Sequence, residues 1–369
     1  LVGGGDPTLT TDVLGDMARD LKAAGVNEIT GRFRVYSAAL PYVRAIDDEQ
    51  ADHLGYNPAI SGLNLNFNRV YFEWKRASGG YEVTMDARAR RFRPQVSLTR
   101  MRIVDRETPV YAYSQAQGRE NWSVARSALG NSGGRWLPVR KPDAYAGEVF
   151  RTLARSHGIV LRPAGAIALP PQGTVVVENF SSELRLILRD MLRYSTNLTA
   201  EVVGLSASAA GGRRVRSLRA SSLQMQNWFG ESLGGRNARF RDHSGLGDGS
   251  LLSANEMLHA LVQVGPDGPL RRIMKEIKLV GDDGRPLPRQ PMEIRAKTGT
   301  LNFVSALSGY LRSPGGRDLA FAMFLADPER RARLSEAERE RPPGGRAWTR
   351  RARALQQQLL LRWGSVYEI

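Results

Sequence analysis

The stretch "RAKTGTLNFVSALSGYL", residues 295–311, holds Lys297, followed at once by Thr298, Gly299 and Thr300. Lysine is rare in this chain of 369 residues, whose 53 basic residues are 6 lysines and 47 arginines. A lysine carries a compact ammonium that can titrate, whereas arginine is a planar fork that stays charged. The sequence therefore predicts that the position of Lys297 needs a small, titratable charge.

The residues around this stretch predict helices packed on a sheet. The expected elements are helices over 145–156, from 181 or 182 onward, from 253 to about 264 and over 348–363, with strands over 302–312 and 318–326. Ser313-Pro314-Gly315-Gly316 is a strong hairpin signal between the two strands, and Ser253 with Glu256 forms a capping box. Helices, then an antiparallel hairpin, then a closing helix indicate the α+β class.

The first 140 residues predict a different, mostly-β region. The expected elements are a helix over 11–24 capped by Thr11, a strand over 28–36, and a hairpin of strands 63–76 and 81–87. The segment 129–143 is rich in Gly and Pro, which predicts a linker and a domain boundary. We therefore expect one domain region over 1–140, which can itself be two nested domains, and another over 141–369.

Composition excludes several function classes. No run of eighteen apolar residues occurs, so no membrane-spanning helix is expected. The chain has no cysteine and only four histidines, which are not in metal-ligand spacing, so no metal or other cofactor is expected. The net charge of +16 comes from arginine spread along the whole length, and no RNA- or DNA-binding motif occurs. We therefore expect no nucleic-acid partner.

Two tripeptides in a fixed order carry the chemistry. Penicillin-interacting serine enzymes combine S-x-x-K, S-x-N and K-T-G in that order. Lys297-Thr298-Gly299 matches the last motif, and Ser195-Thr196-Asn197, about a hundred residues earlier, matches the second. The other S-x-N, Ser253-Ala254-Asn255, is explained by helix capping. Two alternatives remain open: Ser195–Asn197 is a helix C-cap with Asn197 left-handed, or Lys297–Gly299 is an ordinary turn between strands.

Two rival sites are weaker. Gly130-Asn131-Ser132-Gly133-Gly134 matches the G-x-S-x-G nucleophile elbow, but its flanks lack the required buried strand and following helix. We interpret it as part of the linker. Asp242, His243 and Ser244 are neighbours in one loop, whereas catalytic triads are assembled from distant segments. We therefore expect neither stretch to hold a nucleophile.

Longer segments add a family resemblance. They are 3–35 ("GGGDPTLTTDVLGDMARDLKAAGVNEITGRFRV"), 143–159, 191–203 around Ser195, and 241–258 ("RDHSGLGDGSLLSANEML"). Together with the two motifs, they make the chain resemble D-alanyl-D-alanine carboxypeptidases/endopeptidases. More closely, it is similar to low-molecular-mass penicillin-binding proteins with inserted accessory domains.

The resemblance implies a fold and a set of roles. The fold is a penicillin-binding, serine β-lactamase-like domain of sheet and helices with an inserted mostly-β accessory region over 1–140. Ser195 would relay a proton toward the leaving amine, and Asn197 would hold the substrate amide. Lys297 would supply positive potential, Gly299 would admit the substrate backbone, and Thr298 or Thr300 would bind the terminal carboxylate. The implied ligands are peptidoglycan peptides ending in D-Ala-D-Ala and inhibitory β-lactams, in the periplasm.

The chain departs from the family pattern at the nucleophile. No S-x-x-K occurs, and the nearest stretch, Ser182-Glu183-Leu184-Arg185, has an arginine, which cannot act as a base. We expect the S-x-x-K to lie upstream of Leu1 in a longer, exported enzyme, so that the chain alone forms no acyl-enzyme. The alternative is a relative that binds peptidoglycan without cutting it.

Overall fold

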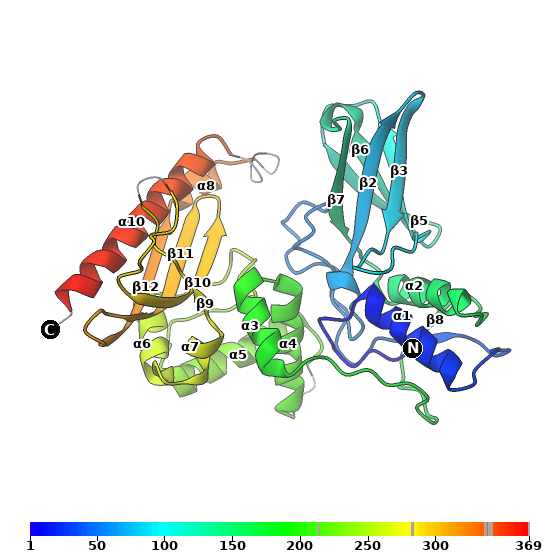
Figure 1. The fold of residues 1–369 in the computed structure, drawn as a ribbon, viewed down its shortest axis with the longest axis horizontal. Coiled ribbons are helices and arrows are strands. Elements are labelled where there is room, and N and C mark those ends of the chain that lie inside the picture. Colours follow the sequence, from blue (N-terminus) through cyan, green and yellow to red (C-terminus); the bar gives the residue numbers. More distant parts are fainter. Residues whose placement is uncertain (213–214, 282–283, 336–337, 339–341, 368–369) are drawn as a thin grey trace. The chain divides into compact units, whose positions relative to one another are not determined.

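The computed structural model describes residues 1–212, 215–281, 284–335, 338 and 342–367, which form two compact units (Figure 1). Unit 1 comprises Leu1–Ser182, Thr196–Ser222 and Arg241–Asp248, and unit 2 comprises Glu183–Ser195, Leu223–Phe240 and Gly249–Ile369. The chain therefore passes from unit 2 to unit 1 between Ser195 and Thr196. The domain boundary predicted near residue 140 stays a prediction.

The elements of unit 1 are α1 (Thr11–Ala23), β1 (Arg34–Tyr36), β2 (Arg69–Ala77), β3 (Gly80–Asp86), β4 (Thr99–Val104), β5 (Tyr111–Ala116), β6 (Arg119–Ala125), β7 (Ser132–Pro138), α2 (Pro142–Ser156), β8 (Gly165–Ile167) and α4 (Asn197–Ala210), with short 3-10 turns at Asn66–Asn68 and Arg126–Ala128. Those of unit 2 are α3 (Leu184–Tyr194), α6 (Ala254–Val264), α7 (Pro269–Ile273), β9 (Lys275–Glu276), β10 (Glu293–Leu301), β11 (Val304–Arg312), β12 (Asp318–Ala326), α8 (Pro328–Ala332) and α10 (Gly345–Val366). Helix α5 (Leu218–Leu233) begins in unit 1 and ends in unit 2.

Unit 2 is built on an antiparallel sheet in the order β12-β11-β10-β9. The predicted hairpin is confirmed: β11 pairs with β12 from Val304 to Arg312, and the turn closes through the Gly316 N–H donating to the Ser313 carbonyl. Helices cover both faces, because Leu307 and Leu311 pack with Leu360 of α10 while Tyr310, on the opposite face, donates to a carbonyl of α6. A strand covered on both faces is apolar almost throughout.

Close packing between β10 and β11 requires a glycine at position 309. Gly309 pairs with Ala296, and a Cβ there would lie 2.1 Å from the carbonyl oxygen of Arg295. That atom belongs to the backbone of the strand that carries Lys297. Gly309 therefore fixes how closely the two strands approach.

Substituting Gly309 tests this packing. We expect Gly309→Ala to lower the free energy of unfolding by about 1–3 kcal/mol, the usual cost of overpacking. Gly130→Ala is the matched control, because nothing lies within 4 Å of a Cβ at Gly130. Chemical denaturation of both variants measures the difference, and equal stabilities would contradict the account.

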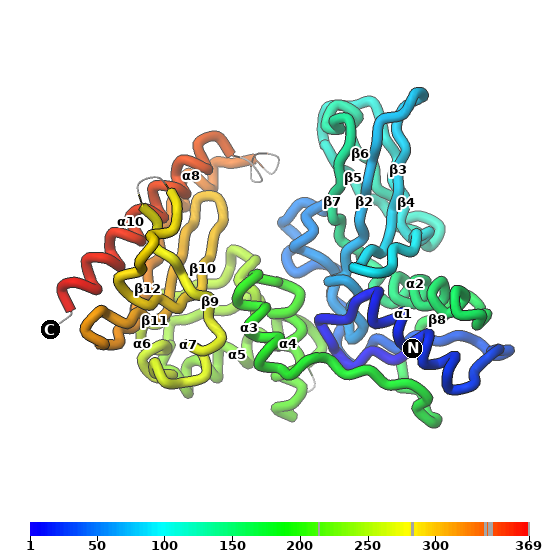
Figure 2. Tube along the Cα trace, viewed as in Figure 1, coloured from blue at the N-terminus to red at the C-terminus, as the bar shows by residue number. Residues whose placement is uncertain are grey.

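Unit 1 contains two three-stranded sheets, β3-β2-β7 and β4-β6-β5 (Figure 2). Strand β6 pairs parallel to β4 and antiparallel to β5, and β2 pairs antiparallel to both neighbours. The largest core of the described residues includes Leu14 of α1, Phe72 of β2, Trp122 of β6 and Val149 of α2. The helices α1 and α2 thus share one apolar core with both sheets.

The predicted strand over 63–76 is wrong in its first half. Strand β2 begins at Arg69, and Asn66, Phe67 and Asn68 have positive φ. The apolar alternation arises because the intervening asparagines are buried and hydrogen-bonded: Asn68 Nδ2, for example, donates to the carbonyl of Ala59 and to Asn64 Oδ1. Asparagine tolerates the left-handed region better than other non-glycine residues, which permits this turn.

The predicted linker over 129–143 is also wrong. Residues 132–138 form β7, which pairs with β2, and α2 begins at Pro142, three residues before the predicted start. A Cβ at Gly133 or Gly134 would collide with the ring of Trp74 or Tyr71, so these glycines allow aromatic side chains of β2 to cross the neighbouring strand. Ser132 therefore lies at the start of a paired strand and not on a nucleophile elbow.

Other boundaries shift by a few residues. Thr10 caps α1, while the Thr11 hydroxyl donates to the carbonyl of Ala87. The strand predicted over 28–36 is limited to β1 (Arg34–Tyr36), and α3 begins at Leu184 rather than 181 or 182. The capping box at Ser253 and Glu256 is confirmed. The closing helix is confirmed and extends from 345 to 366.

A buried carboxyl joins the strands of unit 1 to α2. Glu120 is fully buried, and its Oε1 accepts the backbone N–H groups of Arg140 and Lys141. Burial raises the pKa of Glu120 from 4.5 to about 7, although these hydrogen bonds and the charge of Arg140 lower it. The folded protein therefore holds a proton on Glu120 between these pH values, where the unfolded chain does not.

This raised pKa predicts a pH dependence of stability. The contribution of Glu120 is fully present below pH 4.5 and is lost as the pH rises through about 7. Glu120→Gln is neutral at every pH and keeps an acceptor oxygen, so its stability relative to the natural chain should increase by on the order of 3 kcal/mol across that range. Denaturation at several pH values measures this, with the exposed Glu82→Gln as control. A pH-independent difference would contradict the assignment.

Candidate functional site

Lys297 lies on β10 where the sheet has a free edge. Strand β9 pairs only with Arg295 and Ala296, so from Lys297 to Leu301 the described residues pair β10 with β11 alone. The alternative that Lys297–Gly299 forms a turn is excluded, because all three residues lie within a regular ladder. The K-T-G segment therefore presents an unpaired strand edge. An extended ligand needs such an edge in order to pair with the sheet.

Helix α3 brings Ser195 to this edge. The helix packs on α7 and β9, and its Leu192 joins a cluster with Leu261, Met274 and Tyr310. Ser195 is the C-cap residue, with φ 53° and ψ 52°, which ends the helix in the left-handed conformation. Its Oγ accepts a hydrogen bond of 2.5 Å from Lys297 Nζ. Two motifs about a hundred residues apart in sequence thus meet through one contact.

The surroundings of Lys297 favour loss of its proton. Burial lowers the pKa of Lys297 below its ordinary value of 10.5, and the charge of Lys275 lowers it further. The ammonium also donates to the carbonyl of Thr298. Among the described residues, no carboxylate forms a salt bridge with Lys297. The Ser195–Lys297 pair is therefore suited to moving a proton between a hydroxyl and an amine.

The residues after Lys297 provide exposed hydroxyls. Thr298 and Thr300 are exposed, and Gly299 packs beside Ala306 of β11, to which a Cβ would come within 3.3 Å. Arg353 of α10 reaches Thr300, with 3.4 Å between Nη2 and Oγ1. A hydroxyl beside a guanidinium is a suitable pair of donors for a carboxylate.

Asn197 belongs to the other unit. It begins α4, and its Nδ2 donates to the carbonyl of Tyr56 at 2.9 Å, within unit 1. The interpretation of Asn197 as a left-handed cap is wrong, because Ser195 is the left-handed residue and Asn197 is helical. The structure therefore joins Ser195 to Lys297, and the role of Asn197 stays a prediction.

Sequence reasoning missed a buried network that holds α4. His243 Nδ1 lies 2.9 Å from Glu201 Oε2, which accepts a hydrogen bond from it, and His243 Nε2 lies 3.1 Å from Ser221 Oγ. The backbone N–H of Ser244 also donates to Glu201. The three side chains come from distant segments, as in a triad, but Glu201 and Ser221 are fully buried. The network therefore fastens the 241–248 loop to the helix that Asn197 begins.

Gly204 makes this contact possible. A Cβ at Gly204 would lie 2.0 Å from the ring of His243, so the ring packs directly on the backbone of α4. The adjacent Asp242, His243 and Ser244 do not form a triad with one another. No group of histidines and carboxylates among the described residues could hold a metal.

Comparison with known structures gives the class of fold. Penicillin-binding protein 4 (dacB) from Haemophilus influenzae matches with a TM-score of 0.68 at 21% identity, over 92% of this chain and 80% of that chain. The same protein in complex with a β-lactam matches with a TM-score of 0.66 at 20% identity, over 92% and 79%. The predicted α+β class, with the arrangement of a penicillin-binding protein, is confirmed.

Comparison of sequences gives the family. The model for the D-Ala-D-Ala carboxypeptidase 3 (S13) family matches residues 1–341, and the chain therefore belongs to this family of peptidases. A D-alanyl-D-alanine carboxypeptidase of Actinomadura sp. (strain R39) is 26% identical over 357 residues, and DacB of Haemophilus influenzae is 24% identical over 339. The alignments cover 88% and 87% of this chain but only 64% and 70% of the relatives.

The electrostatic account of Lys297 can be tested by removing its charged neighbour. Lys275→Gln should raise the pKa of Lys297 toward its ordinary value without restoring it, since burial is the larger cause. With ¹³C-labelled lysine, the few Cε signals can be titrated individually by NMR. Lys278→Gln, which removes an equal charge nearby in sequence, is the control. A Lys297 pKa that stays unchanged in Lys275→Gln would contradict the account.

Proposed function

We propose that this chain supplies the proton-transfer and carboxylate-binding groups of a serine-type D-Ala-D-Ala carboxypeptidase/endopeptidase. The substrates would be peptidoglycan peptides ending in D-Ala-D-Ala, cleaved in the periplasm through an acyl-enzyme that β-lactams mimic. The observation that carries this proposal is the hydrogen bond between Lys297 Nζ and Ser195 Oγ at the free edge of β10. Membership of the carboxypeptidase family supports it.

The geometry fits the proton transfers that acyl transfer needs. A serine oxygen attacks the peptide carbonyl, the C–N bond to D-alanine breaks, and the leaving nitrogen must gain a proton. Ser195 can give its proton to that nitrogen and be reprotonated by Lys297, whose lowered pKa reduces the cost of cycling. Water then attacks the ester, and its proton returns along the same pair.

The terminal carboxylate of the substrate would bind beside this pair. Thr300 offers a hydroxyl, and Arg353 adds a guanidinium that already contacts it. Thr298 is a second exposed hydroxyl on the same strand. A carboxylate held here would place the scissile peptide bond near Ser195, because the ligand would extend along the unpaired edge of β10.

The sequence holds no S-x-x-K, the motif that would supply the nucleophile and its base. Arg185, in the nearest stretch, is paired with Glu183 on the surface. We therefore propose that this chain binds substrate and β-lactam but is not acylated by itself.

Incubation with a penicillin tests whether the chain binds a β-lactam without being acylated by it. The purified 369-residue chain, incubated with a fluorescent penicillin, should show no covalent label and no adduct in its intact mass. Penicillin-binding protein 4 of Haemophilus influenzae, which has been solved in complex with a β-lactam, serves as the positive control. Reversible binding of a D-Ala-D-Ala peptide should weaken by about tenfold in Arg353→Gln, the value of one charge-assisted hydrogen bond. A covalent adduct on this chain would overturn the assignment of roles.

A second function follows from the same observation. A relative that holds peptidoglycan peptides without cutting them would also need Thr300 and Arg353, but it would not need Lys297 to titrate. Lys297→Met would then leave peptide affinity unchanged, and no preparation of the protein would release D-alanine.

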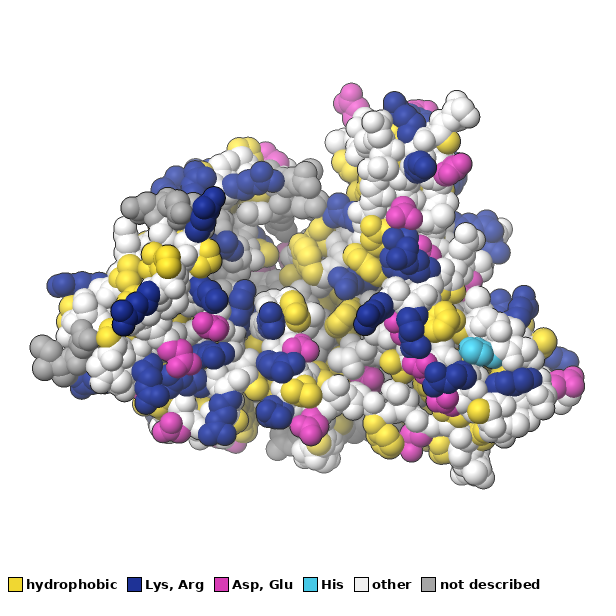
Figure 3. Space-filling view, viewed as in Figure 1, with side chains coloured by type: hydrophobic (Ala, Val, Ile, Leu, Met, Phe, Trp, Pro, Cys, Tyr) yellow, Lys and Arg dark blue, Asp and Glu magenta, His cyan; other side chains and the backbone are white. Residues whose placement is uncertain are grey.

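Basic side chains do not favour a nucleic-acid function. Figure 3 shows Lys and Arg side chains scattered over the visible face and interspersed with Asp and Glu, with no basic track among them.

Among the described residues, no helix is both long and apolar enough to cross a membrane.

A further inference from the structure

The accessory sheets of unit 1 leave an open slot between two edge strands. Strand β3 is at one edge of its sheet and β4 at one edge of the other. The segment that connects the two strands turns back on the end of β3, where the Val96 N–H donates to the Met85 carbonyl and the Ala87 N–H donates to the Pro94 carbonyl, both at 2.9 Å. Beyond that junction no ladder pairs β3 with β4 within residues 1–182, all of which the structure describes.

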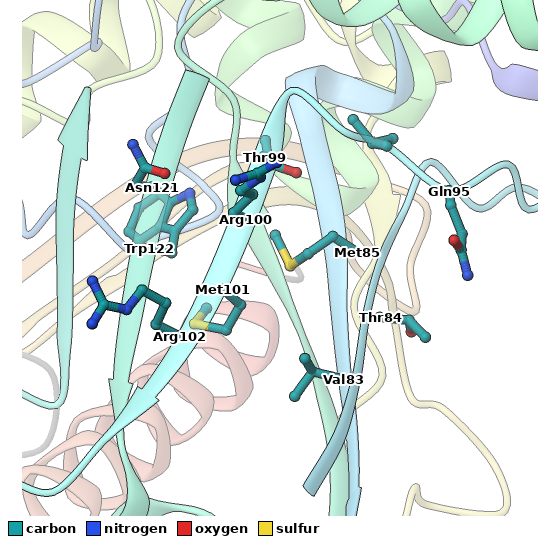
Figure 4. Close-up of a pocket in the computed structure, with 11 residues that line it drawn as sticks. Val83, Thr84, Met85, Gln95, Thr99, Arg100, Met101, Arg102, Asn121 and Trp122 are labelled. Carbon is teal, nitrogen blue, oxygen red and sulfur yellow. The ribbon is translucent and has the colours of Figure 1, made fainter. Parts of the chain in front are cut away.

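The slot is a cavity of about 500 Å³ (Figure 4). Its walls are Val83 and Met85 of β3, residues 99–102 of β4, and Asn121 and Trp122 of β6. This volume falls in the range of ligand-binding pockets. The mixture of apolar side chains with a few polar ones is also typical of such pockets.

Buried polar atoms in the walls lack partners. Thr99 and Trp122 are 2% and 1% exposed, yet Thr99 Oγ1 and Trp122 Nε1 have no hydrogen-bond partner. Thr84 Oγ1, on the face of β3 opposite to Val83 and Met85, is likewise unpaired (Figure 4). A buried polar atom left unsatisfied costs about 1–3 kcal/mol, so these atoms show that the fold is imperfectly satisfied around the slot.

The charged side chains that line the slot are all positive. Arg100 and Arg102 alternate along β4, so their side chains lie on the same face of the strand. Neither arginine has a carboxylate partner among the described residues, and no Asp or Glu lines the slot. Two unpaired arginines two residues apart favour carboxylates with the same spacing on a neighbouring strand.

We propose that this slot binds an extended, acidic segment of a partner protein, which adds as a strand to the open edge of β4. Its backbone would pair with β4, and acidic side chains at alternate positions would contact Arg100 and Arg102. Apolar side chains on the other face would meet Val83, Met85 and Met101. The segment consists of L-residues, because D-residues prefer mirror-image backbone angles and interrupt a regular strand. This site is independent of the proposed acyl-transfer chemistry.

Synthetic peptides test the proposal directly. The probe is a short all-L peptide with alternating valine and glutamate, blocked at both ends, titrated calorimetrically into the full 369-residue chain at low salt. Matched peptides carry glutamine in place of glutamate, N-methyl groups on alternate amides, or alternating L- and D-residues. We expect the acidic peptide to bind about tenfold more tightly than the glutamine peptide. The methylated and L/D peptides should bind more weakly than the acidic peptide.

Paired variants locate the binding site. Arg100→Gln with Arg102→Gln should abolish the preference for the acidic peptide and leave the weaker binding of the glutamine peptide unchanged. Arg90→Gln with Arg93→Gln, which removes equal charge outside the slot, should keep the preference. Hydrogen exchange should show new protection in β4 when the acidic peptide is bound. Thermal unfolding checks that both double variants fold.

Several results would overturn the proposal. They are no binding of any peptide, equal affinity for glutamate and glutamine peptides, and a preference that survives in the Arg100/Arg102 variant. Equal binding of the L/D peptide would show that the slot does not accept a regular strand. Equal loss of the preference in both double variants would show attraction to net charge alone.

Discussion

The hydrogen bond from Lys297 to Ser195 is the contact on which the candidate site depends. It requires that α3 end at Ser195, that the left-handed turn there direct the hydroxyl to β10, and that β9 stop pairing before Lys297. Burial of the lysine and the nearby charge of Lys275 both lower its pKa, so the contact joins a hydroxyl to an amine that can titrate. An arginine at position 297 could form a hydrogen bond but could not exchange the proton.

Within each unit, buried hydrogen bonds support the elements that carry the candidate residues. In unit 2, α10 packs on the sheet through Leu360, and Gln356 donates to the carbonyl of Ser305 in the buried interface, so β10 and β11 have a fixed support. In unit 1, Glu201 and His243 hold the helix that begins at Asn197. Both anchors place buried polar groups in satisfied hydrogen bonds, which favour one arrangement over others. Ser195, Thr298 and Thr300 are exposed and Lys297 is partly buried, whereas Gln356 and Glu201 are buried.

The sequence predicted the parts of the fold that depend on local signals. The hairpin at Ser313–Gly316 and the capping box at Ser253 are determined by short-range chemistry, and the structure confirms both. The prediction failed at the asparagine-rich turn before β2 and at the glycines of β7. In both places contacts outside the local pattern decide the conformation: a hydrogen bond to the carbonyl of Ala59 in the first, and packing on aromatic side chains of β2 in the second. A pattern of residue types does not contain that information.

The candidate site was predictable in part for the same reason. The motif order indicated Ser195 and Lys297, and their contact agrees with it. The contacts of Arg353 and Glu201 could not be predicted, because each is made with a residue distant in sequence, Thr300 and His243 respectively. Neither residue lies in a recognisable motif. Their importance is visible only when α10 and α4 are placed beside the elements they contact.

The most direct test of the central claim is the rate at which penicillin acylates the protein as isolated from its own host. Intact mass spectrometry over time would follow the adduct in the natural protein and in Lys297→Arg. If the isolated protein carries an S-x-x-K segment, which these 369 residues lack, the account predicts one adduct on the serine of that segment. The adduct should form about a hundredfold more slowly in the arginine variant, the usual contribution of a general acid–base group. Equal rates in the two proteins, or an adduct on Ser195 itself, would contradict it.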